Sequence, residues 1–142
     1  MKKLLLMASA MVFTLSCSSS DDSSSNNSNS NSSSKITPPA WIQGTWVDKD
    51  TYDLTNYKVG YIFRADDICM LNISHETCWK ESINLHNNVP NSPKAIVNES
   101  ISDTEYKCSI TLASQTIYYN FQKISSNTIK NIDNGGIYTK IN

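Results

Sequence analysis

The segment Glu105–Lys123 reads EYKCSITLASQTIYYNFQK. Apolar side chains occupy every second position on both sides of Ala113-Ser114: first Tyr106, Cys108, Ile110 and Leu112, then Ile117, Tyr119 and Phe121. This period of two is typical of a strand with one buried face, because a helix would repeat its apolar residues every three to four positions. The segment therefore predicts an antiparallel hairpin that turns at Ala113-Ser114.

The same alternation recurs on both sides of this hairpin, and no segment shows a convincing helical stripe. Further strands are expected over 40–48, 56–64, 68–73, 77–85, 95–100, 128–132 and 137–141. About eight or nine short strands predict an all-β fold, a small antiparallel barrel or sandwich, over residues 36–142. The segment Thr77–Leu85 is ambiguous, because the spacing of Trp79 and Ile83 also suits two turns of helix.

The first 16 residues are organised like a signal peptide. Lys2 and Lys3 precede an apolar stretch of about 12 residues, which is too short to span the apolar core of a bilayer, about 30 Å thick. Leu15-Ser16-Cys17 then precedes an abrupt polar run and resembles the lipobox of bacterial lipoproteins, in the looser form found in Bacteroidetes. The resemblance implies cleavage before Cys17, acylation of that residue and stable attachment to a membrane. The alternative is a plain secretory signal in which Cys17 is incidental.

A polar segment follows Cys17. Asp21 and Asp22 resemble the lipoprotein export signal of Bacteroidetes, which implies display on the outer face of the outer membrane; in the alternative interpretation they are two solvated charges and the protein faces the periplasm. Residues 18–34 comprise 11 Ser, 4 Asn and 2 Asp. Such a stretch cannot bury enough apolar surface to offset the entropy of ordering it, so residues 17–35 are expected to form a disordered linker.

The charge of the chain argues against a nucleic-acid partner. The net charge is −1, and removal of Lys2 and Lys3 with the signal leaves 10 basic and 13 acidic side chains, a net charge of −3. A protein that binds nucleic acid needs a basic excess to neutralise phosphates, and this chain has none.

The stretch Trp41-Ile42-Gln43-Gly44-Thr45-Trp46 contains a Gly-x-Trp pattern in the first expected strand of the domain. The pattern resembles the first-strand signature of lipocalin-like barrels. In that family the Trp closes one end of the barrel, and a cation from the last strand lies across its ring. Lys140 is the matching cation here. The resemblance implies that the first and last strands are neighbours and that Gly44 permits the close approach of the chain near Trp46.

A barrel of this size holds either its own side chains or one small ligand. If the barrel is correct, four aromatic side chains face inward and are the candidates for an apolar ligand pocket: Tyr61, Phe63, Tyr119 and Phe121. The alternative is ordinary barrel filling. A second class of function is a protein-binding inhibitor or immunity lipoprotein, similar to the small β-barrel lysozyme-inhibitor lipoproteins. It would act on a protein partner through an exposed loop, for which Asn87–Lys94 is the best candidate.

With Cys17 acylated, three thiols remain for an oxidising compartment. Cys69 and Cys78 fall on two strands joined by one turn, and a hairpin centred near Ile73-Ser74 would place them opposite each other, within disulfide reach. Cys108 is in phase with apolar neighbours and is expected to be a buried thiol. A pairing that involves Cys108, or no disulfide at all, are the alternatives.

The chain gives little indication of catalysis or of a metal. His75 and His86 are expected in a turn and at a strand end, without the close Cys or His spacing of a zinc site. The acidic residues near positions 48–50 and 66–67 lack the Gly and the spacing of a calcium loop and are interpreted as turn residues. No Gly-x-Ser-x-Gly nucleophile motif occurs in the chain. The expectation is a non-enzymatic protein without metal or cofactor.

Overall fold

The computed structural model describes residues 31–33 and 35–142. The expected signal peptide, Cys17 and nearly all of the linker lie outside the described residues. The described strands are β1 (Asn31–Ser33), β2 (Gly44–Asp48), β3 (Val59–Arg64), β4 (Asp67–Asn72), β5 (His75–Cys78), β6 (Ile96–Ile101), β7 (Glu105–Leu112), β8 (Gln115–Ser125), β9 (Thr128–Asn131) and β10 (Ile137–Ile141). Two helices accompany them, α1 (Lys49–Thr55) and α2 (Trp79–Asn87).

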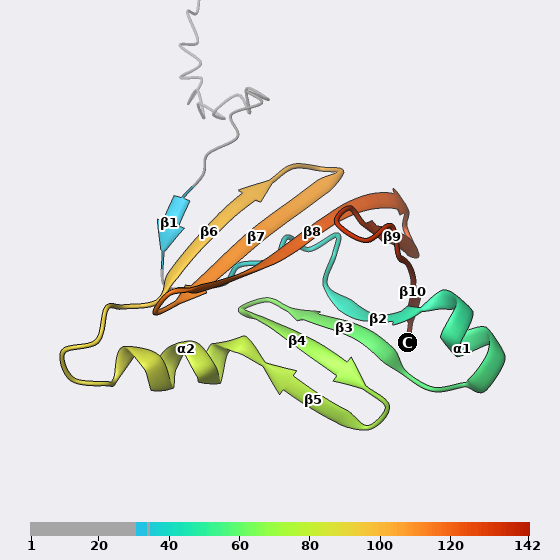
Figure 1. Ribbon diagram of the computed structural model, residues 1–142. Coiled ribbons are helices and arrows are strands. Elements are labelled where there is room, and N and C mark those ends of the chain that lie inside the picture. The colour runs from blue at the N-terminus through green and yellow to red at the C-terminus, as the bar shows by residue number, and fades with distance from the viewer. Residues whose placement is uncertain (1–30, 34) are drawn as a thin grey trace, which may run out of the picture.

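The strands form one antiparallel sheet in the order β1-β6-β7-β8-β9-β10-β2-β3-β4-β5. The sheet curls into a half-barrel, with β6–β8 above and β3–β5 below in the view of Figure 1. The first strand of the domain, β2, pairs with the last, β10, and Trp46 stands opposite Lys140 in that ladder. The predicted all-β, antiparallel fold is confirmed, and so is the hairpin, with β7 and β8 joined at Ala113-Ser114.

The sheet remains open on one side. In the part of the chain that the structure describes, β5 is the end of the sheet, and the chain continues into α2 before it returns as β6. Figure 1 shows α2 beside the lower layer, with its loop leading up to β6. The sequence left strand and helix open for Thr77–Leu85. In the structure β5 ends at Cys78, and the rest of this segment is part of helix α2.

Helix α2 begins directly after Cys78. The backbone N–H of Lys80 donates to the Asp67 carboxylate over 2.8 Å, which satisfies one of the free donors of the first turn. Ile83 is the buried residue of the helix and packs in the core. Trp79, four positions earlier, also packs against the core. The helix therefore has only two core contacts, which is why its periodicity is weak in the sequence.

The second helix, α1, was not predicted. It has no buried residue, so it lacks the apolar stripe that marks most helices in a sequence. Its ends are fixed instead by polar contacts: the Asp48 carboxylate accepts the N–H of Thr51 over 2.8 Å, and Asn56 adopts a left-handed conformation at the C-terminal end. The expected strand 56–64 accordingly begins only at Val59, and the expected strand 40–48 begins at Gly44 because Ile42 closes a turn onto Pro39.

The core fills the space between the two layers. Its largest fully buried side chains are Trp46, Tyr106, Phe63 and Phe121. Gly60 allows β2 and β3 to approach here, because a Cβ atom on Gly60 would lie 2.1 Å from the Trp46 carbonyl oxygen. Among the described residues, no helix has the length and apolar character needed to cross a membrane.

Candidate functional site

The four aromatic residues expected to line a pocket are packed on one another. The ring centroids of Tyr61 and Phe121 are 5.1 Å apart, those of Phe63 and Phe121 are 5.2 Å apart, and those of Tyr61 and Tyr119 are 6.1 Å apart. These are contact distances for aromatic pairs, so the rings leave no room for a ligand between them. Phe63, Tyr119 and Phe121 are buried and belong to the core, whereas Tyr61 is half-buried.

A groove opens beside Tyr61, on the inner face of the β2–β5 part of the sheet. Its volume is about 560 Å³. The strand register explains its lining: Tyr61 stands opposite Met70, and Met70 stands opposite Thr77. These side chains share the inner face, yet 44% of Met70 is exposed. The inner face is therefore accessible at this groove, which residues of β2, α1 and β10 line together with those of β3, β4 and β5.

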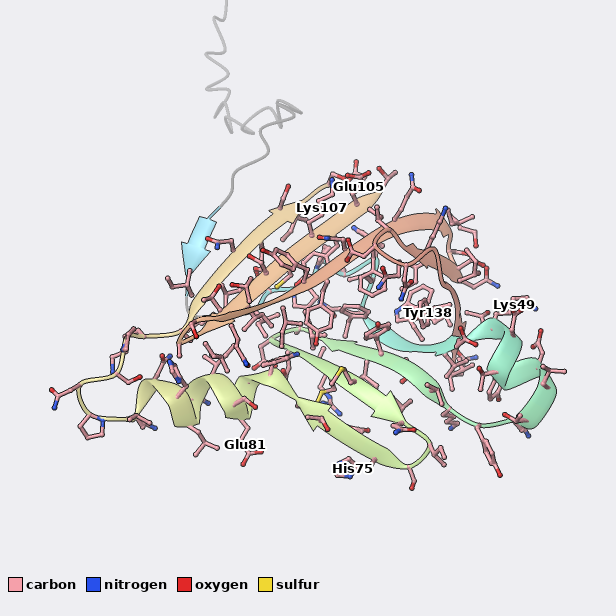
Figure 2. All side chains as sticks on the ribbon, in the orientation of Figure 1. Lys49, His75, Glu81, Glu105, Lys107 and Tyr138 are labelled. Carbon is pink, nitrogen blue, oxygen red and sulfur yellow. A yellow bond between two sulfur atoms is a disulfide. The ribbon has the colours of Figure 1, made fainter. Side chains whose placement is uncertain are left out.

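The groove has an apolar floor and a polar rim. Val59, Tyr61, Met70 and Tyr138 supply apolar surface, and the polar lining side chains are Asp48, Thr51, Asn72, His75 and Thr77. Tyr138 is buried, with its ring centroid 5.1 Å from that of Tyr61, and burial raises the pKa of its hydroxyl to about 12. The Tyr138 hydroxyl thus stays neutral above the pH at which an exposed tyrosine ionises. Figure 2 shows Tyr138 between the two layers and His75 at the outer end of the lower layer.

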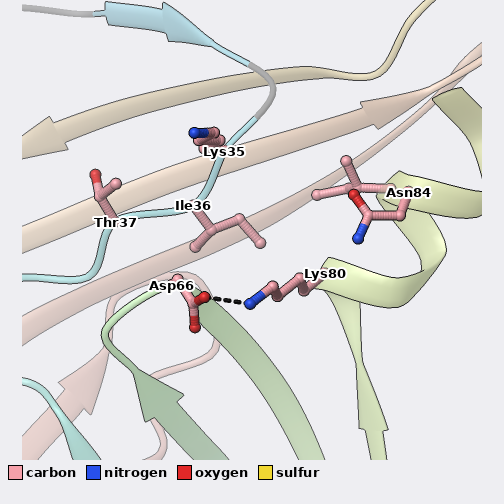
Figure 3. A pocket seen from close by; sticks show the side chains of 7 residues that line it. Lys35, Ile36, Thr37, Asp66, Lys80 and Asn84 are labelled. Atoms are coloured by element: carbon pink, nitrogen blue, oxygen red, sulfur yellow. Dashed lines mark hydrogen bonds and ion pairs between the residues drawn. The ribbon is translucent and has the colours of Figure 1, made fainter.

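A second, smaller hollow of about 310 Å³ lies between α2 and the segment that enters the domain. Figure 3 shows Ile36 at its centre and the ion pair of Lys80 with Asp66 across its edge. Ile36 and Ile83 are buried and give the hollow an apolar floor. It is farther from the predicted ligand residues, since none of Tyr61, Phe63, Tyr119 and Phe121 lines it.

The predicted disulfide between Cys69 and Cys78 is present. The two residues stand directly opposite each other on β4 and β5, and their sulfur atoms are bonded. The Arg64 guanidinium lies 2.6 Å from Cys69 Sγ and 3.2 Å from Cys78 Sγ, and it also pairs with Glu76 over 2.6 Å. The bridge therefore fastens β5, the end of the sheet, to β4 beside the groove.

Cys108 is the free cysteine among the described residues, and it is buried as predicted. Burial raises the pKa of its thiol to about 12, so the thiol is neutral and unreactive in the folded protein. Asp67, Cys69 and Cys78 place three potential metal ligands within 4.8 Å of one another. The two sulfur atoms are joined in the disulfide, which leaves no thiolate to bind a metal ion.

Gly44, Trp46 and Lys140 meet as the lipocalin-like resemblance implies. Lys140 Nζ lies 5.3 Å from the centroid of the Trp46 ring and donates to the Gln43 carbonyl oxygen over 2.6 Å. Trp46 is fully buried, and its indole N–H donates to the Ile42 carbonyl oxygen over 2.6 Å. The three residues therefore close one junction of the half-barrel and form a structural site; none of them lines the groove, although Trp46 stands opposite Tyr61 in the β2–β3 ladder.

The histidines and acidic residues that the sequence offered as possible metal ligands lie apart from one another in the structure. His75 lies at the groove, whereas His86 Nε2 is 2.9 Å from the Pro93 carbonyl oxygen, in the loop after α2. Asp48 caps α1 and Asp66 pairs with Lys80, in keeping with local roles. Asp67 departs from its predicted place in a turn: it is the buried first residue of β4 and accepts the N–H of Lys80.

Glu99 is a buried carboxylate that the sequence interpretation missed. It accepts hydrogen bonds from the backbone N–H and the hydroxyl of Thr37 and from the Tyr106 hydroxyl over 2.6 Å. Its position in phase with the buried Val97 on β6 is the sequence signal that could have revealed an inward-facing acid. The three hydrogen bonds tie the segment that follows the linker to the upper layer.

Comparisons of the chain with protein-family models, with curated proteins and with solved structures found no match.

Proposed function

We propose that this protein is a non-enzymatic, lipid-anchored binding module whose groove beside Tyr61 takes one small amphiphilic molecule. The observation that carries the proposal is the accessible inner face: Met70 points to the inside of the half-barrel and is nevertheless 44% exposed, within a groove of about 560 Å³. Ligand sites commonly have volumes of about 300–1,000 Å³, with an apolar lining and a few polar groups that fix orientation.

The lining selects the chemistry of the ligand. An apolar body would pack on Val59, Tyr61 and Met70, where burial of apolar surface is the favourable term. A polar group would face Asn72, His75 and Thr77 at the exposed edge. The groove is open, so a ligand that is apolar throughout would leave much of its surface in water. A molecule with one apolar and one polar side fits better.

The binding test uses the Cys17→Ala chain, which avoids lipid and detergent. The neutral fluorophore 6-propionyl-2-dimethylaminonaphthalene, which carries a polar carbonyl group at one end of an apolar ring system, is titrated into this protein and into two further variants. Met70→Asp places a charge on the groove floor and should abolish the fluorescence increase. Ile124→Asp changes an apolar strand residue that is 56% exposed and does not line the groove, so it should leave the increase unchanged. No increase with the parent chain, or the same response in both variants, would contradict the proposal.

The anchor part of the proposal is supported by the residues around Cys17 and by the acidic pair that follows it. Acylation of Cys17 would hold the domain at the outer membrane, with display at the cell surface as the proposed orientation and a periplasmic orientation as the alternative. Cys17→Ala should release the protein from the membrane fraction, whereas Cys108→Ala should not. Protease accessibility on intact cells separates the two orientations. Membrane retention of Cys17→Ala would contradict the anchor.

A second candidate function is supported by the loop after α2. The Asn87 side chain accepts the N–H of Ala95 over 2.7 Å, and the Asn87 carbonyl oxygen accepts from Lys94. These contacts and the His86–Pro93 hydrogen bond fix a protruding loop that carries the exposed Val89. A loop ordered in advance loses little entropy on binding, which suits an inhibitor that inserts it into a protein partner. If a partner protein co-purifies with the parent chain and is lost from the Val89→Asp variant, the result favours this function over ligand binding in the groove.

A further inference from the structure

A third hollow lies on the opposite surface of the molecule, on the outer face of β6, β7 and β8. Its volume is about 330 Å³. The strand register arranges its side chains in two rows. Asn98, Ser109 and Tyr118 stand side by side in one row, and Ser100, Lys107 and Asn120 form the next.

Tyr118 is the unusual member of this surface. Tyr119 and Phe121, on the same strand β8, face inward and are buried, whereas 61% of Tyr118 is exposed. A large exposed aromatic ring on a sheet is a common anchor for a ligand, because it offers a wide contact area at little cost in side-chain entropy. Here it stands amid groups that form hydrogen bonds rather than amid other apolar side chains.

The polar side chains around Tyr118 are mainly neutral. Two amides and two hydroxyls line the hollow. The Asn98 amide lies 3.5 Å from the Ser109 hydroxyl, and the Asn120 amide nitrogen donates to the Asp133 carboxylate over 2.9 Å, which leaves the Asn120 amide oxygen as an acceptor. Two charged residues line the hollow, Lys107 and Glu99. Lys107 is paired with Glu105 on the same strand over 2.8 Å, and Figure 2 shows both on the outer side of β7. The Glu99 carboxylate is turned inward, where it accepts hydrogen bonds from Thr37 and Tyr106. The hollow therefore carries little net charge, and it offers both donors and acceptors.

We propose that this surface binds a neutral polysaccharide. A sugar ring presents a face of C–H groups, which can pack on the Tyr118 ring, and hydroxyls at its edge, which match the amides and hydroxyls of Asn98, Ser109 and Asn120. Each row crosses three strands and is therefore roughly 10 Å wide. The two rows are two residues apart along the strands, roughly 7 Å. This area matches the footprint of one or two hexose units. The hollow is open to solvent, so a chain can continue beyond it. The site is separate from the groove beside Tyr61 and does not depend on ligand binding there.

Affinity gel electrophoresis of the Cys17→Ala chain tests the proposal with dextran, xyloglucan, galactomannan and soluble starch as neutral probes and alginate as an anionic one. We expect at least one neutral probe to retard the protein. Tyr118→Ala should weaken that binding about tenfold or more. Tyr118→Phe keeps the ring and should retain most of it, and Asn98→Ala should weaken it by a smaller factor.

Tyr57→Ala is the matched control, because Tyr57 is another exposed tyrosine and lies outside the hollow. Circular dichroism of each variant shows whether the fold is kept. The proposal is overturned if no neutral probe retards the protein, if alginate alone does, or if Tyr57→Ala and Tyr118→Ala weaken binding equally. Met70→Asp should leave polysaccharide binding unchanged, which separates this site from the groove.

Discussion

The ammonium group of Lys140 lies 5.3 Å from the centre of the buried Trp46 ring, and the two residues stand opposite each other where the last strand pairs with the first. Nearly the whole domain separates them in sequence. This contact thus joins the two ends of the domain. The Lys140 side chain covers one face of the indole, and its ammonium group donates a hydrogen bond to the Gln43 carbonyl oxygen. It lies at the junction whose pairing holds the half-barrel together.

Trp46→Ala should lower the free energy of unfolding by about 3–5 kcal/mol, because it removes a fully buried indole. Lys140→Ala should lower it by about 0.5–2 kcal/mol. In the double variant the effect of Lys140→Ala should largely vanish, since the shared contact is already lost. Urea denaturation of the four proteins measures the coupling.

The matched control for this cycle is Trp41, whose ring lies 5.8 Å from Lys123 Nζ. Trp41→Ala and Lys140→Ala share no such contact and should be additive. Additive losses for Trp46→Ala and Lys140→Ala as well would show that the ring and the ammonium group do not interact.

Gly44→Ala should destabilise the protein for two reasons that can be separated. The residue has φ +130°, which L side chains rarely adopt, and a Cβ atom would lie 2.5 Å from Lys140 Cε. We expect a loss of about 1–3 kcal/mol in the free energy of unfolding. In the Lys140→Ala background the steric part disappears and the backbone part remains.

Gly135→Ala is the control for the backbone part, because Gly135 also has a positive φ, +77°, but no atom lies within 4 Å of its Cβ position. Its cost should be about 1–2 kcal/mol and should not change when Lys140 is replaced. If Lys140→Ala fails to reduce the cost of Gly44→Ala, the Lys140 side chain does not cross Gly44.

The Cys69–Cys78 disulfide should stabilise the protein by about 2–3 kcal/mol, the range expected for a short loop. Reduction, or the double substitution Cys69→Ala with Cys78→Ala, should lower the urea midpoint by a corresponding amount. The bond also fixes β5, which carries His75 and Thr77 of the groove, so the same change should weaken probe binding. Peptide mapping without reduction should find Cys108 as a free thiol. Equal urea midpoints with and without the bond would refute a stabilising role.

The strands were predictable because the sequence encodes burial on one face with a period of two, and β7 and β10 begin and end at the expected residues. The disulfide followed from the register of the β4–β5 hairpin. Helix α1 was not predictable from periodicity, since none of its residues is buried and its stability comes from Asp48 and Asn56 at its ends. Capping residues alone are too common in turns to identify a helix of this length.

The groove could be predicted only in part. The alternation places Tyr61 and Phe121 on the inner face in the same way, and both rings do face inward. Whether an inward-facing side chain is buried depends on which other elements pack over it, and this is a property of the whole topology. The Phe121 side chain is fully buried between the two layers, whereas Tyr61 lines the groove together with residues of β2, α1 and β10. Local sequence carries no record of that difference.

The buried acids of the core predict how the protein responds to alkali. Burial raises the pKa of Cys108 and of Tyr119 to about 12, above the usual values of about 8.5 for a thiol and 10 for a phenol. Above pH 8.5 the unfolded chain therefore loses the Cys108 proton while the folded protein keeps it. The unfolded state then binds fewer protons, so the free energy of unfolding falls as the pH rises. Urea midpoints between pH 8 and pH 10 should fall for the parent chain and stay nearly level for Cys108→Ala, and both should fall above pH 10 as the tyrosines of the unfolded chain ionise. Iodoacetamide should modify Cys108 only in urea. A parent chain whose midpoints match those of Cys108→Ala up to pH 10 would show that the Cys108 thiol is not held in its neutral form by the core.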